Sequence, residues 1–225
     1  MQGPDAGEIL DGILPGIPVT LFLTGLGLAL GFVLGLGLAL LRIYSKDWAF
    51  VAVGYEKIVR GIPLLVIIYI FYFGFPQLFG LLPALLRPFF SASFALGITS
   101  AAYQSQIFRG AILSVDPSQA MAARALGMTN YQAQVHVVLP QAFRIALSSW
   151  TNEYAVVIKD ASFASVIGVA DMVRLANNVT ATSPAARFLA MLIVAAIYFL
   201  LTYPVTNFLG ERQSKKLRKL GMGGK

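Results

Sequence analysis

The strongest constraint on this chain is an apolar run from Ile17 to Leu41, which contains no charged residue and ends at Arg42. About 20 apolar residues in a helix span the hydrocarbon core of a bilayer, which is about 30 Å thick. The run is too long for a secretory signal peptide, and the segment before it is acidic where a signal peptide is basic. We therefore expect a helix that crosses a membrane and stays in the protein.

Four further segments are apolar enough to be read as spans. Hydrophobic residues make up 57% of the 225 residues and charged residues 12%, against about 25% charged in a soluble domain. This composition excludes a typical soluble enzyme, a disordered chain and a nucleic-acid-binding domain. We predict one all-α polytopic membrane domain with five transmembrane helices, and the four further spans are 63–82, 89–107, 142–158 and 186–209.

The distribution of basic residues predicts the orientation. Lys and Arg are enriched in cytoplasmic loops. An external N-terminus places thirteen of them inside and three outside, namely Arg87, Arg174 and Arg187. We therefore expect an external segment over 1–14, a membrane domain over 15–212 and a basic cytoplasmic tail over 213–225, with the C-terminus inside.

The internal segment 114–141 carries helix signals where a polar loop is expected. Asp116 followed by proline is a helix start, and Gly127 stands where a C-terminal cap belongs. Thr129 with a glutamine three positions later is a capping box for a second helix, which we expect to end at Pro140 because proline cannot continue it. The sequence thus predicts a cytoplasmic helix–turn–helix.

The same segment carries a known spacing. The run from Met121 to Ala123, then three residues, Gly127, nine residues and a run ending at Leu139 and Pro140 resembles the EAA loop of ABC importer permeases. The family usually has Glu where Met121 stands. Other runs resemble the polar amino acid subfamily (histidine, glutamate, glutamine, arginine and opines) and extend the likeness to about 15–212: Arg60–Val66, Tyr72–Pro76, Ala102–Tyr103, Ile107–Ala111, Asn152–Tyr154, Lys159–Ser162 and Val166–Val169.

The resemblance implies a type I importer permease in the cytoplasmic (inner) membrane of a prokaryote. It implies two cytoplasmic ABC ATPase subunits, a second permease copy or homologous permease, and an extracellular or periplasmic solute-binding protein. We expect no cofactor or metal on this chain, because ATP and Mg would be used by the ATPase, and no phosphate-loop motif occurs in the sequence. The chain is then a transport subunit and not an enzyme. The coupling loop would contact the ATPase through Met121, Ala122, Ala123, Arg124, Gly127, Leu139 and Pro140.

Charged residues at membrane depth indicate a substrate path. Glu153, Lys159 and Asp160 fall in or at the end of the fourth span, where ionisable groups usually face a partner or a water-filled cavity. An amino acid is a zwitterion, so Asp160 and Lys159 can hold its ammonium and carboxylate, and Glu153 can hold a cationic side chain. We expect Tyr72 and Gln104 to join them. This favours arginine, lysine or histidine as cargo.

Several alternatives remain open from the sequence. Lys159 and Asp160 can instead pair with each other and close a gate, and the same machinery can import glutamine or glutamate. Rival classes are an intramembrane enzyme that uses Glu153 and Asp160 as acid and base, a non-transporting scaffold, and a secondary transporter. Gly27, Gly31 and Gly35 at four-residue spacing predict close helix packing, either within the subunit or in a dimer.

Overall fold

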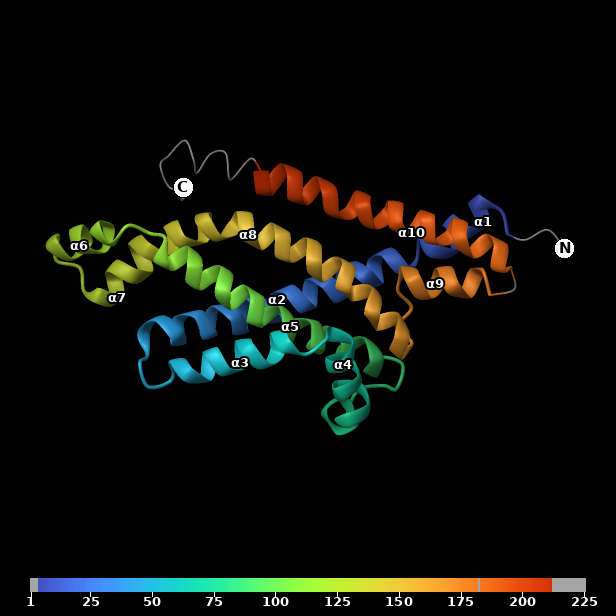
Figure 1. The fold of residues 1–225 in the computed structure, drawn as a ribbon, viewed down its shortest axis with the longest axis horizontal. Helices are drawn as coiled ribbons and strands as arrows, with labels where there is room; N and C mark the ends of the chain where they lie inside the picture. Colours follow the sequence, from blue (N-terminus) through green and yellow to red (C-terminus); the bar gives the residue numbers. More distant parts are fainter. Residues whose placement is uncertain (1–3, 182, 212–225) are drawn as a thin grey trace.

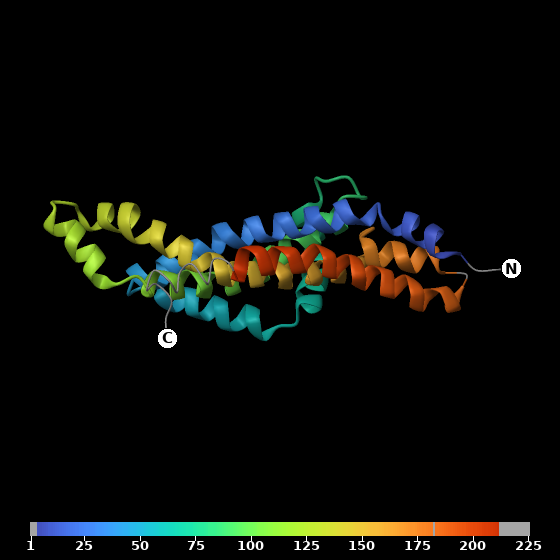
Figure 2. The ribbon, with the colours of Figure 1, turned by 90° about the horizontal axis from the view of Figure 1, so that it is seen from above.

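The computed structural model describes residues 4–181 and 183–211, and every regular element in these ranges is helical. The molecule is elongated (Figure 1). The short helices α6 and α7 lie at one end and α1 and α9 at the other, with α2, α5 and α8 running between them. The same order along the long axis is seen in the perpendicular view (Figure 2). The predicted tail over 213–225 lies outside the described residues.

The first predicted span is helix α2, Gly16–Tyr44, and it is preceded by a short helix α1, Ala6–Ile13. The segment before α2, which we expect to be external, therefore contains a helix. Ile9 and Ile13 of α1 are fully buried against α9 (Met172–Val179) and α10 (Pro184–Val205). The two isoleucines stand four residues apart and so share one face of the helix.

The segment between the first two predicted spans, 42–62, which we expected to be an internal loop, contains a helix. Helix α3, Ala49–Gly61, contacts both α2 and α5. Its inner face carries Ala52 and Glu56, both buried. The charges near its end were taken as loop charges, although Lys57 and Arg60 lie on the exposed face of this helix.

The second predicted span, 63–82, is not one straight helix. Helix α4, Leu64–Tyr69, continues into a π-helical turn, Ile70–Gly74, and then a 3-10 turn, Pro76–Phe79. A bend of 101° separates α3 from this unit. The bend falls at Pro63, whose ring removes the backbone N–H and disfavours a helical residue before it.

The third and fourth predicted spans are α5, Arg87–Leu113, and α8, Leu139–Asp160. Helix α5 contacts α2, α3, α4 and α8. The glycine stripe of α2 faces it, because a Cβ at Gly27, Gly31 or Gly35 would lie within 2.9 Å of an α5 atom. Packing within the subunit therefore accounts for the stripe.

Length and hydropathy together support fewer spans than five. Among the described residues two helical stretches are long and apolar enough to cross a membrane, Ala6–Tyr44 and Pro184–Phe208, and the bent pair α3–α4 can be a third. Helices α5 and α8 are long but carry buried polar residues such as Gln104 and Glu153, which neighbouring helices shield from lipid. Five spans and the orientation of the termini stay predictions.

Candidate functional site

The helical hairpin predicted between the third and fourth spans is present. Helix α6, Pro117–Ala125, begins after Asp116, whose carboxylate accepts a hydrogen bond of 2.8 Å from the backbone N–H of Ser118. This bond holds the pKa of Asp116 below its usual range. The helix ends at Ala125, and Gly127, two residues further on, has φ +88°.

The end of α6 is a complete Schellman motif. The N–H of Gly127 donates to the carbonyl of Arg124 at 2.9 Å, and the N–H of Met128 donates to the carbonyl of Ala123 at 3.2 Å. Both bonds need the left-handed backbone that glycine adopts without strain. The turn between the two loop helices is therefore fixed in one geometry.

The second helix of the hairpin starts as predicted but does not end as predicted. Thr129 and Gln132 form a full capping box at α7, Asn130–Ala133. The chain then widens into a π-helical turn, Gln134–Val138, and continues directly into α8. Pro140 does not stop the helix, because it lies in the first turn of α8, where no backbone N–H is needed.

The hairpin tip exposes an apolar surface. Leu126 is 84% exposed, Tyr131 76% and Met121 54%, and Met128 is also exposed. Ala122 and Arg124 lie on the exposed side of α6, whereas Ala123 is buried. Exposed apolar residues gathered on a rigid element indicate a protein contact site.

The hairpin is braced against the membrane domain at its base. The hydroxyl of Tyr44, at the end of α2, donates a 2.6 Å hydrogen bond to the side-chain oxygen of Gln134. An apolar cluster beneath it joins Val138 and Ala142 to Phe108 and Ile112 of α5. The base of the hairpin therefore contacts α2, α5 and α8.

Two of the predicted substrate residues meet in one buried network. Ser100 of α5 donates to the Glu153 carboxylate at 2.6 Å and accepts from the Gln104 amide at 3.0 Å. The same amide donates to the carbonyl of Leu28 at 3.1 Å, and its oxygen accepts from the indole N–H of Trp150 at 2.9 Å. The network joins α2, α5 and α8, and each Gln104 side-chain atom has a partner.

The other three predicted substrate residues lie elsewhere. Lys159 is exposed and Asp160 half-buried at the end of α8, and over the described ranges no ion pair or hydrogen bond joins them. Tyr72 lines a separate pocket near the start of α5. The five residues thus do not form a single pocket in this conformation.

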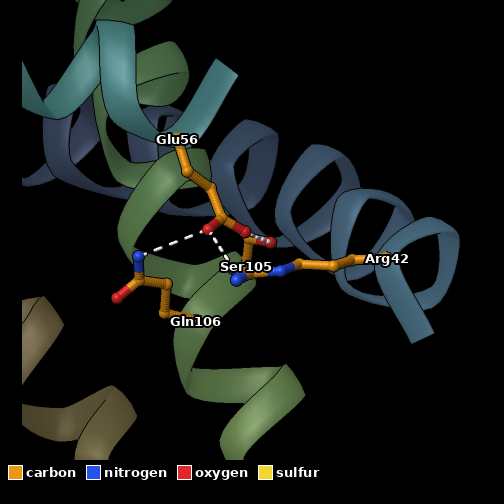
Figure 3. A network of polar contacts seen from close by, with 4 residues as sticks. All are labelled: Arg42, Glu56, Ser105 and Gln106. Atoms are coloured by element: carbon orange, nitrogen blue, oxygen red, sulfur yellow. Dashed lines mark hydrogen bonds and ion pairs between the residues drawn. The ribbon is translucent and has the colours of Figure 1, made fainter. Parts of the chain in front are cut away.

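Sequence reasoning missed a second buried network (Figure 3). The Glu56 side chain of α3 is 3% exposed and forms an ion pair with Arg42 of α2. It also accepts hydrogen bonds from Ser105 at 2.7 Å and Gln106 at 3.3 Å, both on α5. The sequence signal for this network was the spacing of Ala52, Glu56 and Val59, four and three residues apart, which places them on one face of a helix.

A cavity of about 640 Å³ is lined mostly by apolar side chains of α2 together with Trp150 and Tyr154 of α8. None of the five predicted substrate residues lines it. A smaller groove of about 400 Å³ between α5 and α8 is more polar and includes Gln106 and Ser149. The polar groove fits the passage of a hydrophilic solute better than the apolar cavity does.

Comparison with known proteins decides the family. The family described as the inner membrane component of binding-protein-dependent transport systems matches residues 27–219. The chain belongs to this family. The resemblance to ABC importer permeases of the polar amino acid group, inferred from the coupling-loop spacing and the further runs between Arg60 and Val169, is confirmed.

Relatives cover nearly the whole chain. A nopaline transport system permease of Agrobacterium fabrum is 35% identical over 89% of this chain and 86% of its own length. An arginine transport system permease of Bacillus subtilis is 32% identical over 92% of both chains. A probable glutamine ABC transporter permease of the same organism is 34% identical, over 90% of this chain and 93% of its own.

Solved structures agree on the fold. A crystal structure of an amino acid ABC transporter with histidines has a TM-score of 0.80 and 35% identity, covering 95% of this chain and 100% of that one. The MetNI methionine transporter has a TM-score of 0.73 at 16% identity, covering 89% of this chain and 96% of that one, which supports the fold alone. This permease is a transport component, and membership of the family implies a separate ABC ATPase and a substrate-binding protein.

Proposed function

We propose that this permease forms the translocation pathway of an ATP-driven importer of polar amino acids, with basic amino acids as cargo. It works in the bacterial inner membrane as a pair, with a second copy or a homologous permease, and with two ATPase subunits. Five spans, an external N-terminus and a cytoplasmic C-terminus place the α6–α7 hairpin on the side of the ATPases.

The observation that carries the proposal is the capped hairpin at one end of the molecule. Its exposed residues Met121 and Leu126 enter a groove on the ATPase, and Gly127 keeps them in position. Leu139 and Pro140 start α8, so a force on the hairpin reaches α8 directly. The Tyr44–Gln134 hydrogen bond carries the same force to α2.

The preference for basic cargo rests on the acidic residues of α8. Glu153 is held between α5 and α8 by Ser100, and Asp160 stands two helical turns further on. We expect opening of the α5–α8 contact to expose the Glu153 carboxylate to the pathway. A cationic side chain of the cargo is then attracted by this negative charge, whereas the neutral side chain of glutamine is not.

The proposed function is tested by reconstituting the permease with its ATPase and binding protein in proteoliposomes. We expect ATP-dependent accumulation of L-arginine, L-lysine or L-histidine. Accumulation driven by an ion gradient without the ATPase would support a secondary transporter, and the absence of any ATP-dependent uptake would contradict the proposal.

The cargo preference is tested by Glu153→Gln in the same system. We expect uptake of cationic amino acids to fall by about tenfold, which is the effect of one lost charged contact of about 1.4 kcal/mol, with a smaller effect on glutamine. Thr151→Ser, at a buried neighbouring position of α8, is the control. Equal losses for cationic and neutral cargo would remove Glu153 from the specificity argument.

A further inference from the structure

A small pocket lies beside the start of α5, at the end of that helix opposite the α6–α7 hairpin (Figure 1). Its volume is about 260 Å³. Its walls come from the π-helical and 3-10 turns that follow α4, and from the first turns of α5. The lining residues are Tyr72, Phe73, Pro76, Phe79, Arg87 and Ser91.

The guanidinium of Arg87 is held in a fixed orientation. Its Nε donates to the carbonyl of Leu82 at 3.1 Å, and its Nη2 donates to the carbonyl of Gly80 at 3.2 Å. These bonds fold the 80–86 loop around the side chain and leave further N–H groups of the guanidinium for another acceptor. A guanidinium fixed in this way is well suited to hold a carboxylate through two parallel hydrogen bonds.

Ser91 adds an unused polar group to the same pocket. It lies one helical turn after Arg87, it is 1% exposed, and its hydroxyl has no hydrogen-bond partner. A buried hydroxyl without a partner carries a desolvation cost that a bound ligand can remove. By contrast, Ser93 on the same helix is satisfied, because its hydroxyl donates to the carbonyl of Phe89 at 2.9 Å.

The remaining wall is aromatic. Tyr72 and Phe73 lie edge to face with ring centroids 4.7 Å apart, and Phe79 completes the surface. Aromatic faces attract an ammonium group through their quadrupole. The pocket therefore offers a donor set for an anion next to a surface that suits a cation.

We propose that this pocket binds the zwitterionic head group of a free amino acid, with the carboxylate on Arg87 and Ser91 and the α-ammonium against the aromatic rings. The inference rests on the proposed function and deepens it. The pocket recognises the part that all amino acids share, while Glu153 and Asp160 respond to the side chain. Its place at the end of α5 far from the hairpin makes it an entry site for the cargo.

The test measures equilibrium binding to the permease–ATPase complex in nanodiscs without the binding protein. The probes are radiolabelled L-arginine and L-glutamine, with L-argininamide, which lacks the carboxylate, as competitor. We expect saturable binding of both amino acids by the unmodified complex, with L-argininamide at least about tenfold weaker than L-arginine.

Matched variants locate the site. Arg87→Gln is expected to weaken binding of both probes by about tenfold or more and to abolish the discrimination against L-argininamide, and Ser91→Ala to weaken binding less. The controls Arg187→Gln, at an exposed arginine in the first turn of α10, and Ser93→Ala should bind as the unmodified complex does.

Three results would overturn the inference. They are absence of saturable binding to the unmodified complex, equal binding by Arg87→Gln and Arg187→Gln, or unchanged amino acid binding with loss of co-purified phosphatidylethanolamine in Arg87→Gln. The last result would identify a lipid head-group site. ATP-dependent uptake by the unmodified transporter is measured alongside. If uptake is present together with any of these three results, the entry site is rejected and the proposed function stands.

Discussion

Gly31 of α2 lies directly against the polar network formed by Ser100, Gln104 and Glu153. A Cβ at this position would lie 2.6 Å from the Gln104 amide nitrogen and 2.9 Å from the Ser100 side chain. Both neighbours belong to the network that holds Glu153. The size of one residue on α2 therefore controls the geometry of a candidate cargo residue on α8.

Gly31→Ala is expected to lower the free energy of unfolding by about 1–3 kcal/mol, because the added methyl group overpacks the α2–α5 contact. Thermal unfolding of the purified permease in nanodiscs measures the effect. Gly25→Ala and Gly37→Ala on the same helix are matched controls, since a Cβ at either position meets nothing within 4 Å. Equal melting temperatures for all three variants would contradict the packing argument.

Asp171 gives the stability a pH dependence. Its side chain caps α9 by accepting from the N–H of Arg174 at 2.9 Å, but its second oxygen is buried without a partner. Burial raises the pKa of Asp171 from 3.8 to about 6. Between these values the folded state binds more protons than the unfolded state, so the free energy of unfolding falls as pH rises.

Asp171→Asn is expected to stabilise the permease at neutral pH by an amount on the order of 2 kcal/mol, because asparagine caps the helix equally well without a buried charge. The gain should disappear below about pH 4. Thermal unfolding across this range measures both effects, and a variant as pH-dependent as the unmodified protein would contradict the assignment.

At the scale of elements, features that depend on residues close together in the sequence were predicted better than features that depend on packing between distant segments. The caps of the hairpin depend on residues within a few positions of one another, such as Thr129 and Gln132, and they form as predicted. Helix α3 was missed because its charged residues suggested a loop, while its stability comes from packing on α2 and α5. The pocket around Arg87 was missed because it depends on how the turns after α4 and the 80–86 loop pack on the start of α5.

The hairpin turn should be sensitive to backbone conformation and not to side-chain volume. A Cβ at Gly127 meets nothing within 4 Å, but the φ of +88° is unfavourable for a β-branched residue. Gly127→Val is expected to destabilise the turn by about 1–3 kcal/mol, whereas Gly127→Asn should be better tolerated. Hydrogen exchange over residues 117–133 measures the difference, and equal protection in both variants would contradict it.

At the scale of the whole molecule, two buried polar networks join the long helices to one another, while the base of the hairpin is held by the Tyr44–Gln134 hydrogen bond and an apolar cluster. The Glu56 network lies between α2, α3 and α5, and the Gln104 network lies between α2, α5 and α8. Polar contacts inside a helical bundle have defined partners, so they favour discrete arrangements over continuous deformation. If the hairpin couples to an ATPase as proposed, we expect α2, α5 and α8 to move as a unit.

The most direct test of this account is ATP-driven amino acid uptake by a variant altered only at the hairpin tip. Leu126 is 84% exposed, so Leu126→Asp should leave the melting temperature unchanged. It should reduce uptake by at least about tenfold, because a charge in the apolar contact with the ATPase weakens that contact by about 1.4 kcal/mol or more. Leu126→Met is the control and should retain uptake. Full ATP-driven uptake by Leu126→Asp would contradict the claim that the hairpin couples the ATPase to the pathway.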